Sequence, residues 1–307
     1  MMSDSQSYPR KAWVRPGRKG RPRIGFIGAG RVGSALAWHC RRLGYEISGV
    51  VDKRPRQAWV VYGLLKLPYR RVRARDVAAE SDVLFLTVPD SSIEPEFLAI
   101  RRWMLPGTIV AHCSGTLGSD VFHNGEQQGL HTLALHPVQS FVTPAQAIRS
   151  LPGCFFVLEG SPEGRRFGRR LVGQLKGRAV VIRTPDRPLY HALCVFSSNF
   201  LNALLDAAET IAAQLCLSRR QTLRMLLPLM RSVLDNCERF GPVAGLTGPV
   251  QRGDADTVRR HLLALQSRVP ELVSVYRTLS LRLIDMARRQ GLGAGAVRRV
   301  RAVLETV

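Results

Sequence analysis

Short apolar segments recur along the first half of the chain, separated by stretches with turn residues or helical spacing. They are Arg23–Ile27, 46–52, 81–93, 107–115 and 133–141. Continuous β-branched and apolar runs of this length are typical of buried parallel strands. Two further runs, 154–160 and 178–184, surround a helical stretch. The pattern predicts an α/β domain, a doubly wound and mostly parallel sheet, that extends to residue 185.

After Asp186 the apolar positions follow helical spacing. We expect Asp186 to be the N-cap, because a start at Thr184 would place Pro188 where an N–H is needed. One long helix is predicted from Leu189 to Leu217, with a Gly/Pro-rich loop over 240–254 that lines the cleft and Asp254 as the next N-cap. The other helices are expected at about 218–239 (kinked or broken at Pro228), 254–267, 270–290 and 294–305.

Charge and composition restrict the function classes. The formal net charge is +22, but the arginines are spread over the whole chain and aromatic residues make up only 7%. Nucleic acid is therefore not a favoured partner, and small anionic ligands fit the charge as well. No apolar run is long enough to span a membrane, and the basic N-terminus lacks the apolar core of a secretory signal.

The six cysteines are far apart, and none has the spacing of a metal site. We expect no bound metal and interpret the cysteines as free thiols of a cytoplasmic protein.

The first predicted strand runs into three glycines with the spacing G-x-G-x-x-G. Gly28 permits the tight turn, Gly30 lets the backbone approach a pyrophosphate, and Gly33 lets the next helix pack on the strand. The phosphates would bind free N–H groups at the N-terminus of that helix. The candidate cofactor-binding residues of this segment are Gly28, Ala29, Gly30, Arg31, Val32 and Gly33.

The second strand ends at Asp52, where a carboxylate is expected to meet the adenosine ribose. Lys53 and Arg54 follow directly and could hold a 2′-phosphate, which Asp52 would repel. The signals conflict, so the choice between NAD and NADP stays open. Asp52 as a plain turn residue is a third alternative.

Polar and small residues follow the later strands, where ligands of open α/β sheets bind. They are Val88, Pro89, Asp90, Ser114, Gly115, His136 and Pro137, of which the first five are further candidate cofactor-binding residues. On the long helix, His191, Ser198 and Asn202 form an uncharged polar stripe with Asn199 beside it, opposite an apolar face. Either the cleft between the two domains covers this stripe, or the side chains hydrogen-bond to neighbouring helices.

Five segments, in this order, resemble the family of proteins described as Rossmann-like and DUF2520 domain-containing. They are GFIGAGRVGSALA, LFLTVPDSSI, LHPVQSF, YHALCVFSSNFLNAL and LTGPVQRGDADTV. The family is similar in architecture to the group of 6-phosphogluconate dehydrogenase, pyrroline-5-carboxylate reductase and ketopantoate reductase. The resemblance implies an N-terminal Rossmann domain, an all-α C-terminal domain that usually forms a homodimer, and an NAD(P)-dependent oxidoreductase.

Many dehydrogenases of that wider group use a lysine on the first long helix of the second domain. Here the only lysine after Lys66 is Lys176, which precedes that helix. Another donor is needed if charge on the substrate oxygen is to be neutralised. We expect His191 or His136 to be the acid, although His136 could simply shape its loop.

The other predicted site residues have binding or structural roles. Ser198 and Asn199 are expected to hold the substrate, and Arg252 is a candidate for its carboxylate. His112 and His131 are expected to be structural.

The sequence thus predicts three parts: a basic tail without stable structure over 1–22, an NAD(P)-binding Rossmann domain over 23–185, and a helical substrate and dimerisation domain over 186–307. Three functions stay open. They are reduction of a small 2-keto acid such as ketopantoate, reduction of a cyclic imine, and non-catalytic sensing of a dinucleotide.

Overall fold

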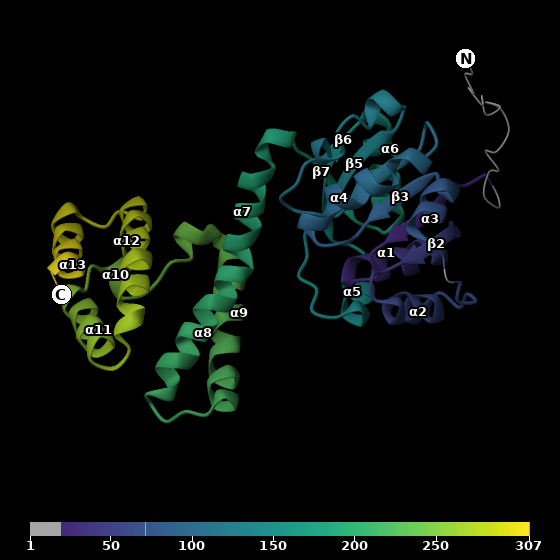
Figure 1. Cartoon of the computed structure of the whole chain (residues 1–307). Coiled ribbons are helices and arrows are strands. Elements are labelled where there is room, and N and C mark those ends of the chain that lie inside the picture. The colour runs from purple at the N-terminus through teal and green to yellow at the C-terminus, as the bar shows by residue number, and fades with distance from the viewer. Residues whose placement is uncertain (1–19, 71, 307) are drawn as a thin grey trace, which may run out of the picture. The chain divides into compact units, whose positions relative to one another are not determined.

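The computed structural model describes residues 20–70 and 72–306. Two compact units divide between Ser198 and Asn199 (Figure 1). The predicted basic tail lies outside the described residues except for its last three. Of these, Arg21 donates to the carbonyl of Leu43 and lies over the ring of Tyr45. The tail's end is therefore attached to the first unit.

A seven-stranded sheet forms the centre of the first unit, with strand order β2-β1-β3-β4-β5-β6-β7. The strands are β1 (Arg23–Ile27), β2 (Glu46–Val51), β3 (Val83–Leu86), β4 (Ile109–His112), β5 (His131–Pro137), β6 (Phe155–Gly160) and β7 (Arg178–Val181). Every neighbouring pair is parallel except β5 and β6. The predicted fold class, a mostly parallel doubly wound sheet followed by helices, is confirmed.

Helices cover both faces of this sheet, and each face has its own apolar core. Ile24 and Phe26 of β1 pack with one set of helices, whereas Leu84 and Leu86 of β3 pack with the other. The first set is α1 (Arg31–Arg42), α2 (Pro55–Leu64), α5 (Pro144–Ser150) and α6 (Pro162–Gln174), and the second is α3 (Ala74–Glu80), α4 (Asp90–Ile100) and η1 (Arg101–Trp103). Alternating side chains of a strand point to opposite faces, so both cores arise from the same strands.

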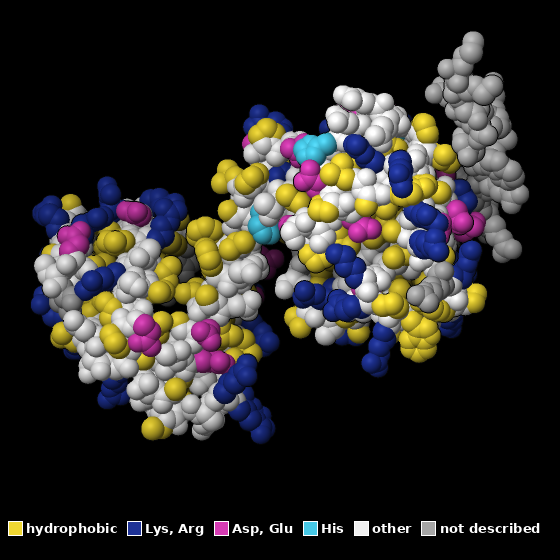
Figure 2. Space-filling model, in the orientation of Figure 1, with side chains coloured by type: hydrophobic (Ala, Val, Ile, Leu, Met, Phe, Trp, Pro, Cys, Tyr) yellow, Lys and Arg dark blue, Asp and Glu magenta, His cyan; other side chains and the backbone are white. Residues whose placement is uncertain are grey.

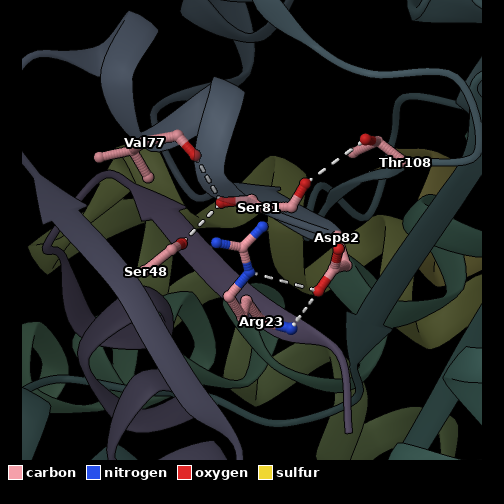
Figure 3. A network of polar contacts seen from close by, with 6 residues as sticks. All are labelled: Arg23, Ser48, Val77, Ser81, Asp82 and Thr108. Carbon is pink, nitrogen blue, oxygen red and sulfur yellow. Dashed lines mark hydrogen bonds and ion pairs between the residues drawn. The ribbon is translucent and has the colours of Figure 1, made fainter. Parts of the chain in front are cut away.

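A polar network joins the ends of the strands opposite to their carboxyl ends (Figure 3). The Asp82 carboxylate accepts from the backbone N–H of Arg23 at 2.6 Å and lies 3.7 Å from its guanidinium. Ser81 bonds to Ser48 through the two hydroxyls at 2.7 Å, and its carbonyl accepts from the Thr108 hydroxyl at 3.4 Å. These bonds hold β1, β2, β3 and β4 together at that edge, which leaves the carboxyl edge for ligands.

The second unit is helical. Its elements are α8 (Asn199–Ala213), α9 (Arg219–Ala244), α10 (Pro249–Arg252), α11 (Ala255–Arg268), η5 (Pro270–Leu272), α12 (Val273–Arg289) and α13 (Ala294–Thr306). A core that includes Val258, Ile284 and Val300 packs the four helices α10, α11, α12 and α13 against one another. The expected N-cap Asp254 is confirmed, because its carboxylate accepts from the Thr257 N–H at 3.0 Å.

The helix predicted from Leu189 to Leu217 is wrong, since two helices occupy this range. The first, α7 (Arg187–Ser197), ends at Ser198, whose φ and ψ are −134° and −69°. The hydroxyls of Ser197 and Ser198 donate to the carbonyls of Leu193 and Cys194, four residues earlier. Serine back-bonding of this kind competes with continued helix. The polar stripe therefore does not lie on one continuous helix.

Other predicted boundaries also differ from the structure. The interruption in α9 falls at Gly241, where φ is +79°, and the helix continues through Pro228. The segment 240–254 is not a continuous loop, because it contains the end of α9 and all of α10. Asp186 does stand at the N-cap of α7, but its carboxylate bonds to Arg183 and caps no N–H. The apolar run 81–93 supplies a strand only over Val83–Leu86, because α4 begins at Asp90.

Candidate functional site

The three glycines lie where β1 turns into α1, and the surroundings of a Cβ atom would differ at each of them. Gly28 has φ +106°, and a side chain there would collide with the backbone of Thr87. A side chain at Gly33 would collide with the Gly28 carbonyl and with Thr87, so α1 could not pack this closely. At Gly30 nothing lies within 4 Å of the position of a Cβ atom. The open side of the loop at Gly30 is therefore free for a ligand.

A cleft of about 1090 Å³ opens over this loop. The predicted residues that line it are Gly28, Ala29, Gly30, Arg31, Val32, Asp52, Lys53, Arg54, Val88 and Pro89. At the N-terminus of α1 the cap residue is Gly30, so no side chain satisfies the first amides of the helix. Such amides and the helix dipole favour an anion. The cleft thus fits a dinucleotide, with its diphosphate at Gly30.

Asp52 is turned toward the glycine loop. One carboxylate oxygen accepts from the Ala29 N–H at 2.8 Å, and the other accepts from the Arg54 N–H at 2.8 Å. The Arg54 guanidinium lies 3.8 Å from the same carboxylate, yet its side chain is 73% exposed. Each Asp52 oxygen therefore already accepts a hydrogen bond from the protein backbone. The basic residues Lys53, Arg54 and Arg56 border the cleft beside it.

A second wall of the cleft comes from the segment after β5. The Arg31 guanidinium donates to the Phe141 carbonyl at 2.8 Å, and Val142 and Pro144 line the cleft. The Gln146 side chain accepts from the Val142 N–H at 2.8 Å. Arg31, the first residue of α1, therefore ties this wall to the glycine loop.

Asp90, Ser114 and Gly115 were predicted to bind the cofactor, but they do not line this cleft, and neither does Gly33. The Ser114 hydroxyl donates to Asp90 at 2.7 Å and accepts from the N–H groups of Thr116 and Leu117. These bonds order the backbone that follows β4, so Ser114 and Asp90 shape the neighbouring loop.

His136, near the carboxyl end of β5, and His191 of α7 lie close together. Their ring centroids are 6.4 Å apart. A Cβ atom at Gly115 would lie 2.5 Å from His191 Nδ1 and 3.0 Å from His136 Nε2. The absence of a side chain at Gly115 thus permits both rings to approach the carboxyl end of β4.

Tyr190 is a functional candidate that the sequence reasoning missed. Its hydroxyl lies 2.6 Å from His136 Nδ1, and the two rings are 5.6 Å apart in an edge-to-face arrangement. Burial, followed by contact with Cys194, raises the pKa of Tyr190, so it stays protonated. The local pattern holds no signal for this pair, because 54 residues separate its members.

Arg187, near the start of α7, is completely buried. One guanidinium nitrogen donates to the Ser114 carbonyl, whereas Nε and Nη1 have no partner among the described residues. Burial, with smaller contributions from Arg187 and His191, lowers the pKa of His136 to about 4. His136 is therefore uncharged at neutral pH.

The remaining predicted site residues fall into three environments. His112 is buried between Gly118 and Ser114, and burial lowers its pKa to about 4. His131 lies on β5, 3.4 Å from the Glu163 carboxylate. Ser198 ends α7, whereas Asn199, Asn202 and Arg252 belong to the second unit, so their contact with substrate stays a prediction.

Two features are absent from residues 20–70 and 72–306. No group of His, Cys, Asp and Glu could hold a metal ion. No helix there combines the length and apolar character needed to cross a bilayer. The six cysteines are free thiols.

Two family models match the chain. A Rossmann-like domain matches residues 9–137, and a domain of unknown function, DUF2520, matches residues 154–283. The antiparallel pairing of β5 and β6 falls at the junction of the two. No curated protein sequence matches the chain.

Solved structures resemble the whole chain at low identity. BF3122 from Bacteroides fragilis, described provisionally as an NADP oxidoreductase, has a TM-score of 0.72 and 21% identity, covering 86% of this chain and 98% of its own. Protein TM1727 from Thermotoga maritima has a TM-score of 0.66 and 23% identity, covering 87% and 99%. An imine reductase from Myxococcus stipitatus in complex with NADP⁺ has a TM-score of 0.62 and 17% identity, covering 91% and 99%. These likenesses establish the fold.

Proposed function

We propose, starting from the fact that the chain belongs to the Rossmann-like and DUF2520 domain-containing proteins, that it is an NADP(H)-dependent oxidoreductase. Its substrate would be a small anionic molecule with a C=O bond. The single observation that carries the proposal is the cleft over the glycine loop. The cleft is open at Gly30 and is bordered by the basic side chains of Lys53, Arg54 and Arg56.

The preference for NADP over NAD rests on Asp52. A carboxylate that binds the ribose hydroxyls needs its oxygens available, but the two oxygens of Asp52 already accept from the N–H groups of Ala29 and Arg54. Lys53, Arg54 and Arg56 border the cleft beside it. A 2′-phosphate would find three positive side chains there against the single carboxylate of Asp52, which already accepts two backbone hydrogen bonds. Two of the similar structures described above carry NADP in their names.

The reduced nicotinamide, when bound, supplies a hydride to the substrate carbon, and the electron pair of the C=O bond moves to the oxygen. The protein must then deliver a proton to that oxygen. We propose His191 as this acid, since His136 is uncharged at neutral pH. Ser198 and Asn199 would orient the substrate, and Arg252 would pair with its carboxylate.

A 2-keto acid such as ketopantoate is the leading substrate class, because the group of reductases that the sequence resembles includes ketopantoate reductase and because the protein is strongly basic. Reduction of a cyclic imine is the second candidate, favoured by the likeness to an imine reductase. Reduction of a C=O bond leaves negative charge on oxygen, and reduction of a C=N bond leaves an electron pair on nitrogen. In both reactions that atom must receive a proton, so the same histidines would act on it.

A panel of 2-keto acids and cyclic imines, tested against consumption of NADPH, separates these functions. The proposal expects turnover of at least one keto acid. Turnover of imines alone would replace it by the second candidate. Binding of NADPH without turnover of any compound would favour a non-catalytic dinucleotide sensor.

We also propose that the protein forms a homodimer through the helical unit. The helix α9 carries Met225, Leu229, Val233 and Phe240 on one face, and all four are exposed. Hydrophobic side chains also gather over the part that Figure 1 labels α7 (Figure 2). An exposed apolar helix face of this length is typical of an interface with a partner.

The division of labour between the parts of the chain is a further proposal. Residues 23–185 would bind the dinucleotide, and residues 186–307 would supply substrate contacts and the dimer interface. The structure begins its second compact unit at Asn199, so α7 with Tyr190 and His191 would belong by sequence to the second part and by packing to the first unit.

A further inference from the structure

The pair formed by Tyr190 and His136 has a role beyond packing. We infer that Tyr190 fixes His136 in the tautomer with its hydrogen on Nε2, so that His136 acts as an uncharged hydrogen-bond donor to the oxygen being reduced. Tyr190 is then a positioning residue, and His136 a catalytic residue that stabilises charge without giving up its proton. The inference rests on the proposed function for the identity of that oxygen.

The direction of the hydrogen bond follows from the neighbours of the hydroxyl. Tyr190 O lies 2.6 Å from His136 Nδ1, and its other polar neighbour is the side chain of Cys194, one turn further on. Tyr190 is half-buried, and of its two polar neighbours an imidazole nitrogen is a far better acceptor of the phenol hydrogen than sulfur. Tyr190 therefore donates to Nδ1, and the hydrogen of the neutral ring is placed on Nε2.

The second nitrogen points to the part of the sheet where a ligand would lie. His136 Nε2 is close to Gly115, directly after β4, and it has no hydrogen-bond partner among the described residues. The carboxyl ends of β1, β3, β4 and β5 share one edge of the sheet, because these strands are parallel. Nε2–H is thus a free donor on the edge that carries the dinucleotide cleft.

The charges around His136 suit an uncharged donor. Arg187 and His191 of α7, His112 of β4 and Asp90 of α4 are the charged or titratable groups that act on it. The buried guanidinium of Arg187 disfavours a second positive charge nearby and favours negative charge on a ligand oxygen. A neutral imidazole that polarises a carbonyl is a known catalytic device.

The tautomer can be measured without substrate or cofactor. Long-range ¹H–¹⁵N NMR of the full-length protein, labelled at histidine, should assign the His136 hydrogen to Nε2, and Tyr190→Phe should shift this ring toward a mixture of tautomers. The matched control is Tyr276→Phe, because Tyr276 and His261 form a similar pair at 2.9 Å. That variant should change His261 alone. A wild-type His136 with its hydrogen on Nδ1, or a tautomer unchanged in Tyr190→Phe, would overturn the inference.

Turnover separates a neutral donor from an acid. Glutamine retains an N–H near the position of Nε2 but cannot titrate, so His136→Gln should keep kcat within about 10-fold of wild type, while His136→Ala should lose about 100-fold. NADPH affinity should stay within about 2-fold in both variants. Equal loss of kcat in the two variants would show that His136 acts as an acid and overturn its role here. If wild type turns over nothing in the panel, the proposed function fails, and the role toward a reduced oxygen fails with it, whatever the NMR result.

Discussion

The Asp52 carboxylate accepts a hydrogen bond from the backbone N–H of Ala29 at 2.8 Å, across the mouth of the glycine loop. The bond holds the loop, and in the proposed cofactor complex it would compete with a bond from Asp52 to the ribose. Asp52→Ala should therefore weaken the binding of NADPH and NADH by a similar factor, about 5- to 10-fold, which corresponds to about 1 to 1.4 kcal/mol, the size of one typical hydrogen bond. Fluorescence titration with each cofactor measures both constants. Loss of NADH binding with NADPH binding retained would instead identify Asp52 as a ribose ligand.

The basic residues after β2 should decide between the cofactors. Lys53→Ala with Arg54→Ala removes two charges that border the cleft, so the Kd for NADPH should rise about 10- to 100-fold. The Kd for NADH should change less than about 2-fold, because NADH has no 2′-phosphate. Arg75→Ala is the matched control, since Arg75 pairs with Asp76 and does not line the cleft. An equal effect on both cofactors would exclude a 2′-phosphate contact.

Much of the first unit could be predicted from local signals. Short apolar runs identified the strands because a parallel sheet buries both of its faces. The roles of Gly28 and Gly33 followed from the tight turn and the close packing of α1. In the structure, a Cβ atom at either position would collide with neighbouring atoms. Asp254 was predictable as an N-cap because it stands directly before a helical run.

The rest depends on contacts between distant residues. No periodicity indicates that Tyr190 meets His136, or that Arg187 is buried against Ser114. The break at Ser198 depends on two serine hydroxyls that bond to carbonyls of their own helix, and the same residues fit a continuous helix equally well by spacing. The inward turn of Asp52 is equally invisible, because a ribose ligand would occupy the same sequence position.

Stability should fall steeply in mild acid. Burial lowers the pKa of His112 and of His136 to about 4, whereas each accepts a proton near pH 6.5 in the unfolded chain. Between these values the unfolded state binds more protons, so the free energy of unfolding decreases as pH falls from about 6.5 to 4. The loss is about 3 kcal/mol for each histidine.

Urea unfolding of wild type and of His112→Gln at pH 7.5, 6 and 5 tests this slope. The variant should show a smaller loss of stability between pH 7.5 and 5 than wild type. His123→Gln is the control, because His123 is exposed and pairs with Glu94 at the surface. Identical slopes in all three proteins would contradict the burial of an uncharged His112.

The apolar face of α9 should hold two chains together. Light scattering should give wild type twice the chain mass of 34.1 kDa. Leu229→Glu with Val233→Glu should give a monomer, because two buried carboxylates would have to lose their hydration at the interface. Leu263→Glu, an exposed apolar position on α11, is the control and should remain dimeric. A monomeric wild type at tens of micromolar would refute the interface.

Calorimetric titration of NADPH is the most direct test of the account, because every proposed step requires a dinucleotide on the glycine loop. Wild type should bind NADPH more tightly than NADH. Gly30→Ala should fold normally, since nothing lies within 4 Å of the added carbon, yet lose at least about 10-fold in affinity because that carbon would occupy space proposed for the diphosphate. No heat with either cofactor, or full affinity in Gly30→Ala, would contradict the central claim.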